Sequence, residues 1–414
     1  MKKRYVFKKL DEIAVPKDQV NKQIEQGKKQ YQKQQKRRKR MKWSGGVAVV
    51  VLLFLALIRF NPSVADALSK IPVFAGFVEL IKHDESLRTA LEHEYVEKID
   101  YTITKKDVKM TIQQISFDGA KMVISYRLTN PNKHLINQWV DTAIDEEEYT
   151  SESSMSPTVE KPSPVKRLDG VIQLYGAELK RDFTLDLTVE IDGKDEKFRF
   201  PIHLTKKLLE PKILAKQQMI ELDGQKMELL QVSRYPLTTL VTIRAAASNT
   251  KNILMIEEMM LYDGKKKVAT LHKGLRSTGS LQDKEGSTYY LQGDYFKSLK
   301  EPRLVLSSIQ ALEKGEEKLI VNLKKKQVIK KPNNTLVTYE LKEDELRIIP
   351  KNEQHTPQIQ LYDANGKEVD DTSYRENGVN IIPVNPKKYK QPLTGDFVMY
   401  PAYLKGEVQV PLKE

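Results

Sequence analysis

A block of basic residues followed by a continuous apolar run constrains this chain more than any other feature. The run extends from Val47 to Ile58 without a polar residue, and the segment from Trp43 to Phe60 has 18 residues. As a helix it would be roughly 27 Å long, which just spans the hydrocarbon core of a bilayer. We therefore predict a transmembrane helix, with Trp43 and Phe60 at the two interfaces and Arg59 extending toward the headgroups.

The net charge of the chain is concentrated before this segment. Residues 1–42 contain 16 Lys and Arg and four acidic residues, whereas the remaining residues carry 53 basic and 52 acidic side chains. The positive-inside rule then places the arm in the cytoplasm and the C-terminal residues outside the cell membrane. A nucleic-acid groove needs positive charge on the folded domains themselves, so the near-neutral remainder argues against nucleic acid as a partner.

A cleaved signal peptide is the alternative to a retained single-pass anchor. Ala65-Asp66-Ala67 has the small-residue spacing of a cleavage site, and an apolar core of 12 residues is typical of signal sequences. A basic leader of 42 residues is unusually long for a signal peptide, which favours the anchor.

The basic arm has its own apolar pattern. Leu10 and Ile13 precede Pro16, which suits a first helical turn, and Val20 and Ile24 then recur on roughly one face. One interpretation is a docking face for a cytoplasmic partner. The other is a solvated arm that fixes the topology and contacts anionic lipid.

The residues after the span change from helical to β patterning. Residues 61–98 are predicted to form a helical stalk in which Asp84 caps a helix containing Leu87 and Leu91. From about Ile99 the apolar period is two. We predict two hairpins. The first has a turn at Asp118-Gly119 between the strands Val108–Ile112 and Met122–Leu128, and the second has a turn at Asp192-Gly193 between the strands Phe183–Ile191 and Phe198–Leu204.

The β patterning recurs, which predicts three domains at 99–207, 208–326 and 327–414. Each opens with a strand pair, has a central Leu-Tyr before a turn and ends in an alternating run. The central marks are Leu174-Tyr175, Leu261-Tyr262 and Leu361-Tyr362, and the closing runs are Phe198–Leu204, Leu319–Leu323 and Val408–Leu412. Coincidence among similar β patterns is the alternative to a true repeat. The lysine-rich runs Lys324–Gln327 and Lys330–Pro332 are expected to lie at a domain joint. The Ser/Pro/Glu-rich stretch 141–166 is expected to form a surface loop.

Catalytic motifs are not recognisable in the chain. The absence of Cys excludes disulfides, thiol nucleophiles and Cys-ligated metals, and the six His residues have no metal-ligand spacing. There is no Walker loop, GxGxxG or GxSxG, and Ser163-Pro-Val-Lys166 lies in the predicted loop. We expect neither an enzyme nor a protein with a cofactor or bound metal.

Several features of the N-terminal third occur together: Leu10-x-x-Ile13-x-Val15-Pro16, the basic approach to the span, the segment Pro62–Phe77, Asp118-Gly119 and the Met122–Leu128 strand. In these features the chain is similar to a group of membrane-anchored bacterial proteins, common in Gram-positive spore-formers, in which a domain of unknown function follows a single span. This resemblance implies an anti-sigma factor for an extracytoplasmic-function sigma factor, with immunoglobulin-like modules after the first domain. A sigma factor would then contact the short helix around Val20 and Ile24.

Together these features predict a mainly β protein: tandem immunoglobulin-like β-sandwiches behind one N-terminal transmembrane helix and a short helical stalk. The expected function is signal transduction across the membrane, from an extracytoplasmic ligand to a cytoplasmic sigma factor. The alternative is a membrane-anchored structural or adhesive protein that binds envelope polymer or protein.

Overall fold

The structure is a computed structural model of the chain. It describes residues 84–148, 151–155, 164–176, 180–271, 277–342, 344–352, 357–369 and 373–413. The basic arm, the predicted span and the predicted stalk up to residue 83 lie outside these residues. No helix in the described part is long and apolar enough to cross a membrane. That part is mainly β and is arranged in several antiparallel sheets, as the alternation predicted.

The described residues begin with a short helix, α6 (Glu85–Glu92). Asp84 is its N-cap, and its side chain accepts a hydrogen bond of 3.0 Å from the backbone N–H of Leu87, which confirms the predicted cap. The apolar side chains of Leu87, Ala90 and Leu91 are buried. The helix therefore packs into the β structure along one face rather than standing free of it.

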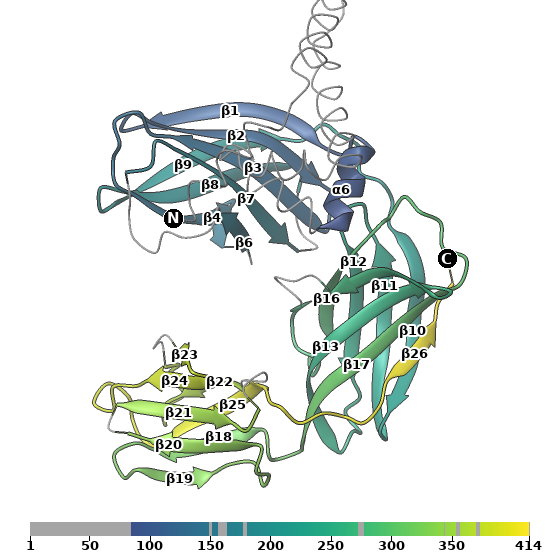
Figure 1. Cartoon of the computed structure of the whole chain (residues 1–414), viewed down its shortest axis with the longest axis vertical. Coiled ribbons are helices and arrows are strands. Elements are labelled where there is room, and N and C mark those ends of the chain that lie inside the picture. Colours follow the sequence, from purple (N-terminus) through teal and green to yellow (C-terminus); the bar gives the residue numbers. More distant parts are fainter. Residues whose placement is uncertain are drawn as a thin grey trace, which may run out of the picture. The chain divides into compact units, whose positions relative to one another are not determined.

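The first β unit consists of two sheets. The five-stranded sheet has the order β1 (Glu97–Lys105), β2 (Val108–Phe117), β3 (Lys121–Thr129), β7 (Arg167–Tyr175) and β6 (Ser151–Met155). The four-stranded sheet has the order β5 (Glu147–Glu148), β4 (Ile136–Ile144), β8 (Asp182–Ile191) and β9 (Lys194–His203). One hydrophobic core contains residues of both sheets, so the sheets pack face to face (Figure 1).

Both predicted hairpins are confirmed. β8 pairs with β9 across the Asp192-Gly193 turn, and β2 pairs with β3 across Asp118-Gly119. In contrast, the stretch 141–166 is not simply a loop, because β6 within it pairs with β7 as an edge strand. Backbone hydrogen bonds form this pairing, so a polar and serine-rich sequence can still provide an edge strand.

The second β unit is one curled sheet of nine strands. The order is β10 (Lys212–Leu222), β11 (Gln225–Arg234), β12 (Thr239–Ala245), β16 (Ser287–Gly293), β14 (Lys266–Leu271), β13 (Lys251–Asp263), β17 (Pro302–Glu313) and β26 (Val408–Pro411), with β15 (Ser277–Thr278) beside β16. The backbone N–H of Lys413 donates to the carbonyl of Leu214 at 3.0 Å. This bond brings the first and last strands together around a single core.

The third β unit again has two sheets around one core. Their orders are β19 (Gln327–Lys330), β18 (Lys318–Asn322), β25 (Leu393–Met399) and β22 (Gln358–Tyr362), and β20 (Val337–Leu341), β21 (Glu345–Pro350), β24 (Val379–Pro383) and β23 (Tyr374–Glu376).

The strands that close the last two units differ from the prediction. Leu319–Leu323, expected to close the second domain, contributes β18, which pairs with β25 of the third unit. Val408–Leu412, expected to close the third domain, contributes β26, which pairs with β17 of the second unit (Figure 1). The third unit is therefore inserted between two strands of the second. Alternation predicts a strand with one buried face, but it does not specify the partner strand.

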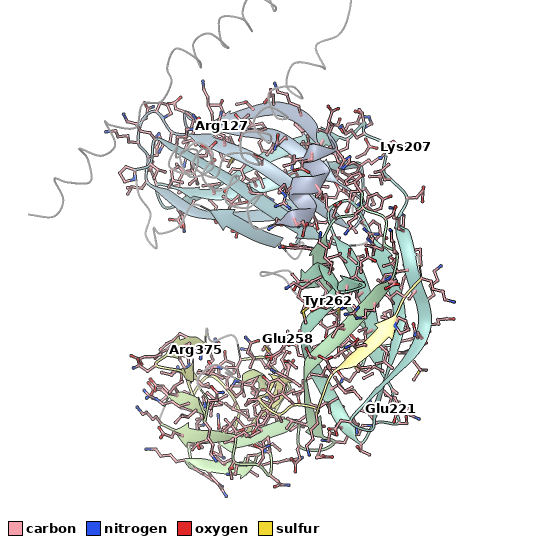
Figure 2. All side chains as sticks on the ribbon, turned by 45° about the vertical axis from the view of Figure 1, so that its right-hand side comes forward. Arg127, Lys207, Glu221, Glu258, Tyr262 and Arg375 are labelled. Carbon is pink, nitrogen blue, oxygen red and sulfur yellow. The ribbon has the colours of Figure 1, made fainter. Side chains whose placement is uncertain are left out.

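The first two units resemble each other at their opening strands rather than at the Leu-Tyr marks. β2 and β11 have the same burial pattern, and each carries a bulge after its fifth residue, at Ile112 and Leu229. The Leu-Tyr marks occupy strands in different sheet positions. Tyr262, for example, lies on β13 (Figure 2). The Arg303 guanidinium lies 4.7 Å from its ring centroid.

Candidate functional site

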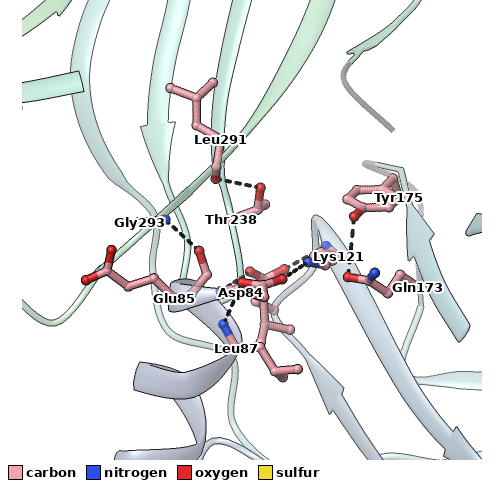
Figure 3. A network of polar contacts seen from close by, with 12 residues as sticks. Asp84, Glu85, Leu87, Lys121, Gln173, Tyr175, Thr238, Leu291 and Gly293 are labelled. Atoms are coloured by element: carbon pink, nitrogen blue, oxygen red, sulfur yellow. Dashed lines mark hydrogen bonds and ion pairs between the residues drawn. The ribbon is translucent and has the colours of Figure 1, made fainter. Parts of the chain in front are cut away.

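A buried ion pair attaches α6 to the first β unit. The Nζ of Lys121, the first residue of β3, lies 2.8 Å from Oδ2 of Asp84, and the side chains are 1% and 0% exposed (Figure 3). The other oxygen of Asp84 caps the helix. Removing two charges from water costs several kcal/mol per ion, and only close pairing with further hydrogen bonds compensates for that cost. The two groups therefore depend on each other.

One aromatic ring lies close to the ammonium group of Lys121. Its Nζ lies 5.2 Å from the ring centroid of Tyr175, a distance at which the ring face attracts a cation. The Tyr175 hydroxyl donates to Oε1 of Gln173 at 3.4 Å. The same ring lies 4.8 Å, between centroids, from Tyr290 on β16 of the second unit. Tyr175 therefore contacts both the ammonium group of Lys121 and an aromatic ring of the second unit.

Asp118 forms the next part of the network, in the turn between β2 and β3. One carboxylate oxygen accepts the N–H groups of Ala120 and Lys121 at 2.9 and 2.7 Å, and the other accepts the N–H of Leu237 at 2.8 Å. Burial raises the pKa of Asp118 to about 6, and the three N–H groups and the charge of Lys121 limit the increase. The pKa of Tyr95 is raised to about 12, mainly by burial and to a smaller extent by the charge of Asp118.

Both ends of α6 contact the second β unit. Near the N-terminus, the Ser86 hydroxyl accepts the N–H of Gly293, at the end of β16, at 2.7 Å. Near the C-terminus, the ring of His93 stacks on Phe296 with centroids 3.8 Å apart. A Cβ on Gly293 would lie 2.8 Å from the Cβ of Ala269. Only glycine therefore fits this close approach without a shift of the neighbouring strand.

We call this set of residues the α6 junction: Asp84, Ser86, Asp118, Lys121, Tyr175, Leu237 and Gly293. The charged groups in it are buried and bonded to protein atoms, so they connect segments of the chain that are far apart in sequence. The junction joins the helix, the β2–β3 turn of the first unit and two segments of the second unit. No group of acidic or His side chains in the described ranges is arranged to hold a metal ion.

The site residues predicted from sequence lie elsewhere. Leu10, Ile13, Val20 and Ile24, the predicted partner-binding residues, are outside the described residues. The predicted membrane residues Trp43, Arg59 and Phe60 are outside them as well. The sequence predicts Asp84 as a cap and Asp118-Gly119 as a turn, but no local pattern indicates that these charged side chains are buried.

Comparison with protein families places part of the junction in a recognised domain. Residues 35–130 match the model of a domain of unknown function, DUF4179. The match includes Asp84, Asp118 and Lys121, and it ends before the second unit, so it covers less than half of the chain. No curated protein matches the chain.

Two solved structures resemble the chain weakly. One is the conserved domain protein from Bacillus anthracis, with 16% identity, 57% of this chain and 84% of that chain covered, and a TM-score of 0.37. The other is a three-domain titin fragment, with 10% identity, coverages of 71% and 91%, and a TM-score of 0.14. Neither similarity is close enough to support an argument about fold or function.

Proposed function

We propose that this chain is a single-pass membrane regulator, an anti-sigma factor whose extracytoplasmic β units control a cytoplasmic arm. The sequence supports this by its basic arm and apolar segment, and by its similarity to membrane-anchored regulators. The DUF4179 match begins at residue 35, so it includes the apolar segment together with the first strands of the first β unit. The paired sheets of the first and third units fit immunoglobulin-like sandwiches.

One observation carries the proposal: α6 is built into the β structure rather than tethered to it. This helix is the first described element after the predicted span, and the ion pair between Asp84 and Lys121 is fully buried. A passive tether would need only a flexible, solvated connection. A helix held by both β units would pass a change in their arrangement to the segment that leads into the membrane.

The cytoplasmic role can be tested with two matched double variants of the arm. Val20→Asp with Ile24→Asp places charges in the predicted docking stripe, at a cost of several kcal/mol if a partner covers it. Asn21→Asp with Gln23→Asp changes the net charge equally and leaves the stripe intact. The first variant should raise transcription from the promoters of the sigma factor at constant membrane level, and the second should not.

Two results would contradict the regulator. A first variant without effect on transcription, together with no sigma factor recovered by the wild-type arm, would favour the structural or adhesive alternative. The orientation is tested separately with protease added to intact cells, which should remove the β units beyond about residue 61. Their protection would contradict the orientation.

A further inference from the structure

The β18–β19 hairpin of the third unit presents a concentrated positive charge. Lys324, Lys325, Lys326, Lys330 and Lys331 are all exposed, and no acidic residue occurs between Glu317 and Glu340. We call these five residues the lysine hairpin. The sequence predicts a joint between domains here, whereas the structure places these lysines on one hairpin of the third unit.

The backbone of the turn is held internally. The N–H of Lys325 donates to Oδ1 of Asn322 at 3.0 Å, and the N–H of Lys326 donates to the carbonyl of Leu323 at 3.1 Å. Within the described part of the chain, none of the five ammonium groups forms an ion pair with a carboxylate. The turn is thus held through its backbone N–H groups, and the lysine side chains remain available to a partner.

Protection of a sheet edge is the simpler explanation of such lysines, because charge on an edge strand prevents pairing with another chain. β19 is indeed the outer strand of its sheet (Figure 1). However, only Lys330 lies within that strand, and three of the five lysines lie in the turn. The opposite edge strand, β22, contains no charged residue at all. Edge protection therefore does not account for the number or the position of the lysines.

We propose that the lysine hairpin binds a linear polyphosphate-like polyanion, and not a nucleic acid, for which the near-neutral β units lack an extended basic groove. All five cations are Lys, whose ammonium acts as a point charge, and no Arg is available between Arg303 and Arg347 for bidentate recognition of a single planar anion. Three of the lysines lie in the turn and two at the far end of β19, so they are spread along the hairpin and do not gather around one small ligand. A chain of phosphates can contact charges distributed around a hairpin.

The test measures lysine accessibility on the purified full-length chain in non-ionic detergent, with long-chain inorganic polyphosphate as the probe. Acetylation of each lysine by an activated ester is followed by mass spectrometry with and without polyphosphate. We expect the acetylation rate of the lysine hairpin to fall several-fold, and the protection to disappear at high salt. Lys265, Lys266 and Lys267, an equally exposed run in the second unit, should keep their rates.

A variant series completes the test. Replacing Lys324, Lys325 and Lys326 with Gln should remove the protection of Lys330 and Lys331, whereas the same change at Lys265, Lys266 and Lys267 should leave it intact. Equal protection of both lysine runs, or protection of the basic arm alone, would overturn the proposal. Protection by phosphatidylglycerol vesicles but not by polyphosphate would assign the hairpin to a membrane surface instead. These readouts are independent of transcription, so they can fail without the regulatory proposal failing.

Discussion

The carboxylate of Asp118 accepts the backbone N–H of Leu237, 119 residues further along the chain, at 2.8 Å. The two residues occupy equivalent turns. In the first unit the N–H of Asp118 donates to the carbonyl of Lys121, and in the second the N–H of Tyr235 donates to that of Thr238, at 3.2 and 2.7 Å. The Asp118 carboxylate thus accepts N–H groups of its own turn and one N–H group of the corresponding turn in the second unit. Loss of this acceptor should affect both units.

Asp118 should make stability depend on pH. Its pKa is about 6 in the folded protein and about 3.9 in an unfolded chain, so between these values the native state binds more protons. The contribution of this group to the free energy of unfolding therefore falls as the pH rises from 4 to 6, by about 3 kcal/mol, and is constant above. Asp118→Asn should be less stable than wild type at pH 4, and the difference should narrow toward pH 6 in urea denaturation.

Asp363 provides a control of opposite sign for that experiment. It also holds a turn, and the N–H groups of Lys390, Lys367 and Asn365 lower its pKa, with partial opposition from burial. Its stabilising contribution is therefore present at neutral pH and lost as the pH falls through its lowered pKa. The difference in the free energy of unfolding between wild type and Asp363→Asn should grow with increasing pH. A difference for Asp118→Asn that stays constant from pH 4 to 6 would contradict the prediction.

The ion pair of the α6 junction should show strong coupling in a double-mutant cycle. Asp84→Asn keeps a capping side chain but leaves the Lys121 ammonium buried without its charge partner, which should cost roughly 3–5 kcal/mol. Adding Lys121→Met to this variant removes the uncompensated charge and should recover most of the loss. Chemical denaturation measures both changes in stability, and hydrogen exchange in the β2–β3 hairpin locates them. Additive losses in the double variant would show that the pair does not act as a unit.

A substitution in β26 should destabilise the second unit, although the sequence pattern assigns this strand to the third. Val410 on β26 is 3% exposed in the core of the second unit, whereas Val398 on β25 of the third unit is 51% exposed. Val410→Asp should destabilise the second unit by several kcal/mol, because it buries an unpaired charge, and Val398→Asp should have little effect. Hydrogen exchange should accelerate in β10 and β17 of the first variant. Acceleration confined to β18 and β25 would refute the assignment.

Two buried tyrosines should respond oppositely to loss of their hydroxyl groups. Tyr126, on β3, is fully buried, and its hydroxyl has no hydrogen-bond partner among the described residues. Tyr126→Phe should therefore raise the free energy of unfolding by about 1 kcal/mol. The Tyr289 hydroxyl accepts the N–H of Ile256 at 3.2 Å, so Tyr289→Phe should lower stability by about 1–3 kcal/mol. Thermal unfolding distinguishes the two variants. A loss of stability in both would mean that the Tyr126 hydroxyl has a hydrogen-bond partner such as water.

Features set by neighbouring residues were predictable from sequence. The β8–β9 hairpin follows from strict alternation on both sides of Asp192-Gly193, and the start of α6 follows from a capping Asp84 before apolar residues at helical spacing. In both cases the residues that form the element also carry its signal, so no distant segment needs to be known.

The tertiary structure alone decided which strands pair and which charged residues are buried. The Leu319–Leu323 and Val408–Leu412 runs each predict a strand, but their hydrogen bonds go to partners in a different unit from the one expected. Asp84, Asp118 and Lys121 would ordinarily be exposed, and only contacts with each other and with the second unit make their burial tolerable. Both outcomes depend on segments far apart in the chain, because burial and strand pairing are properties of the assembled core.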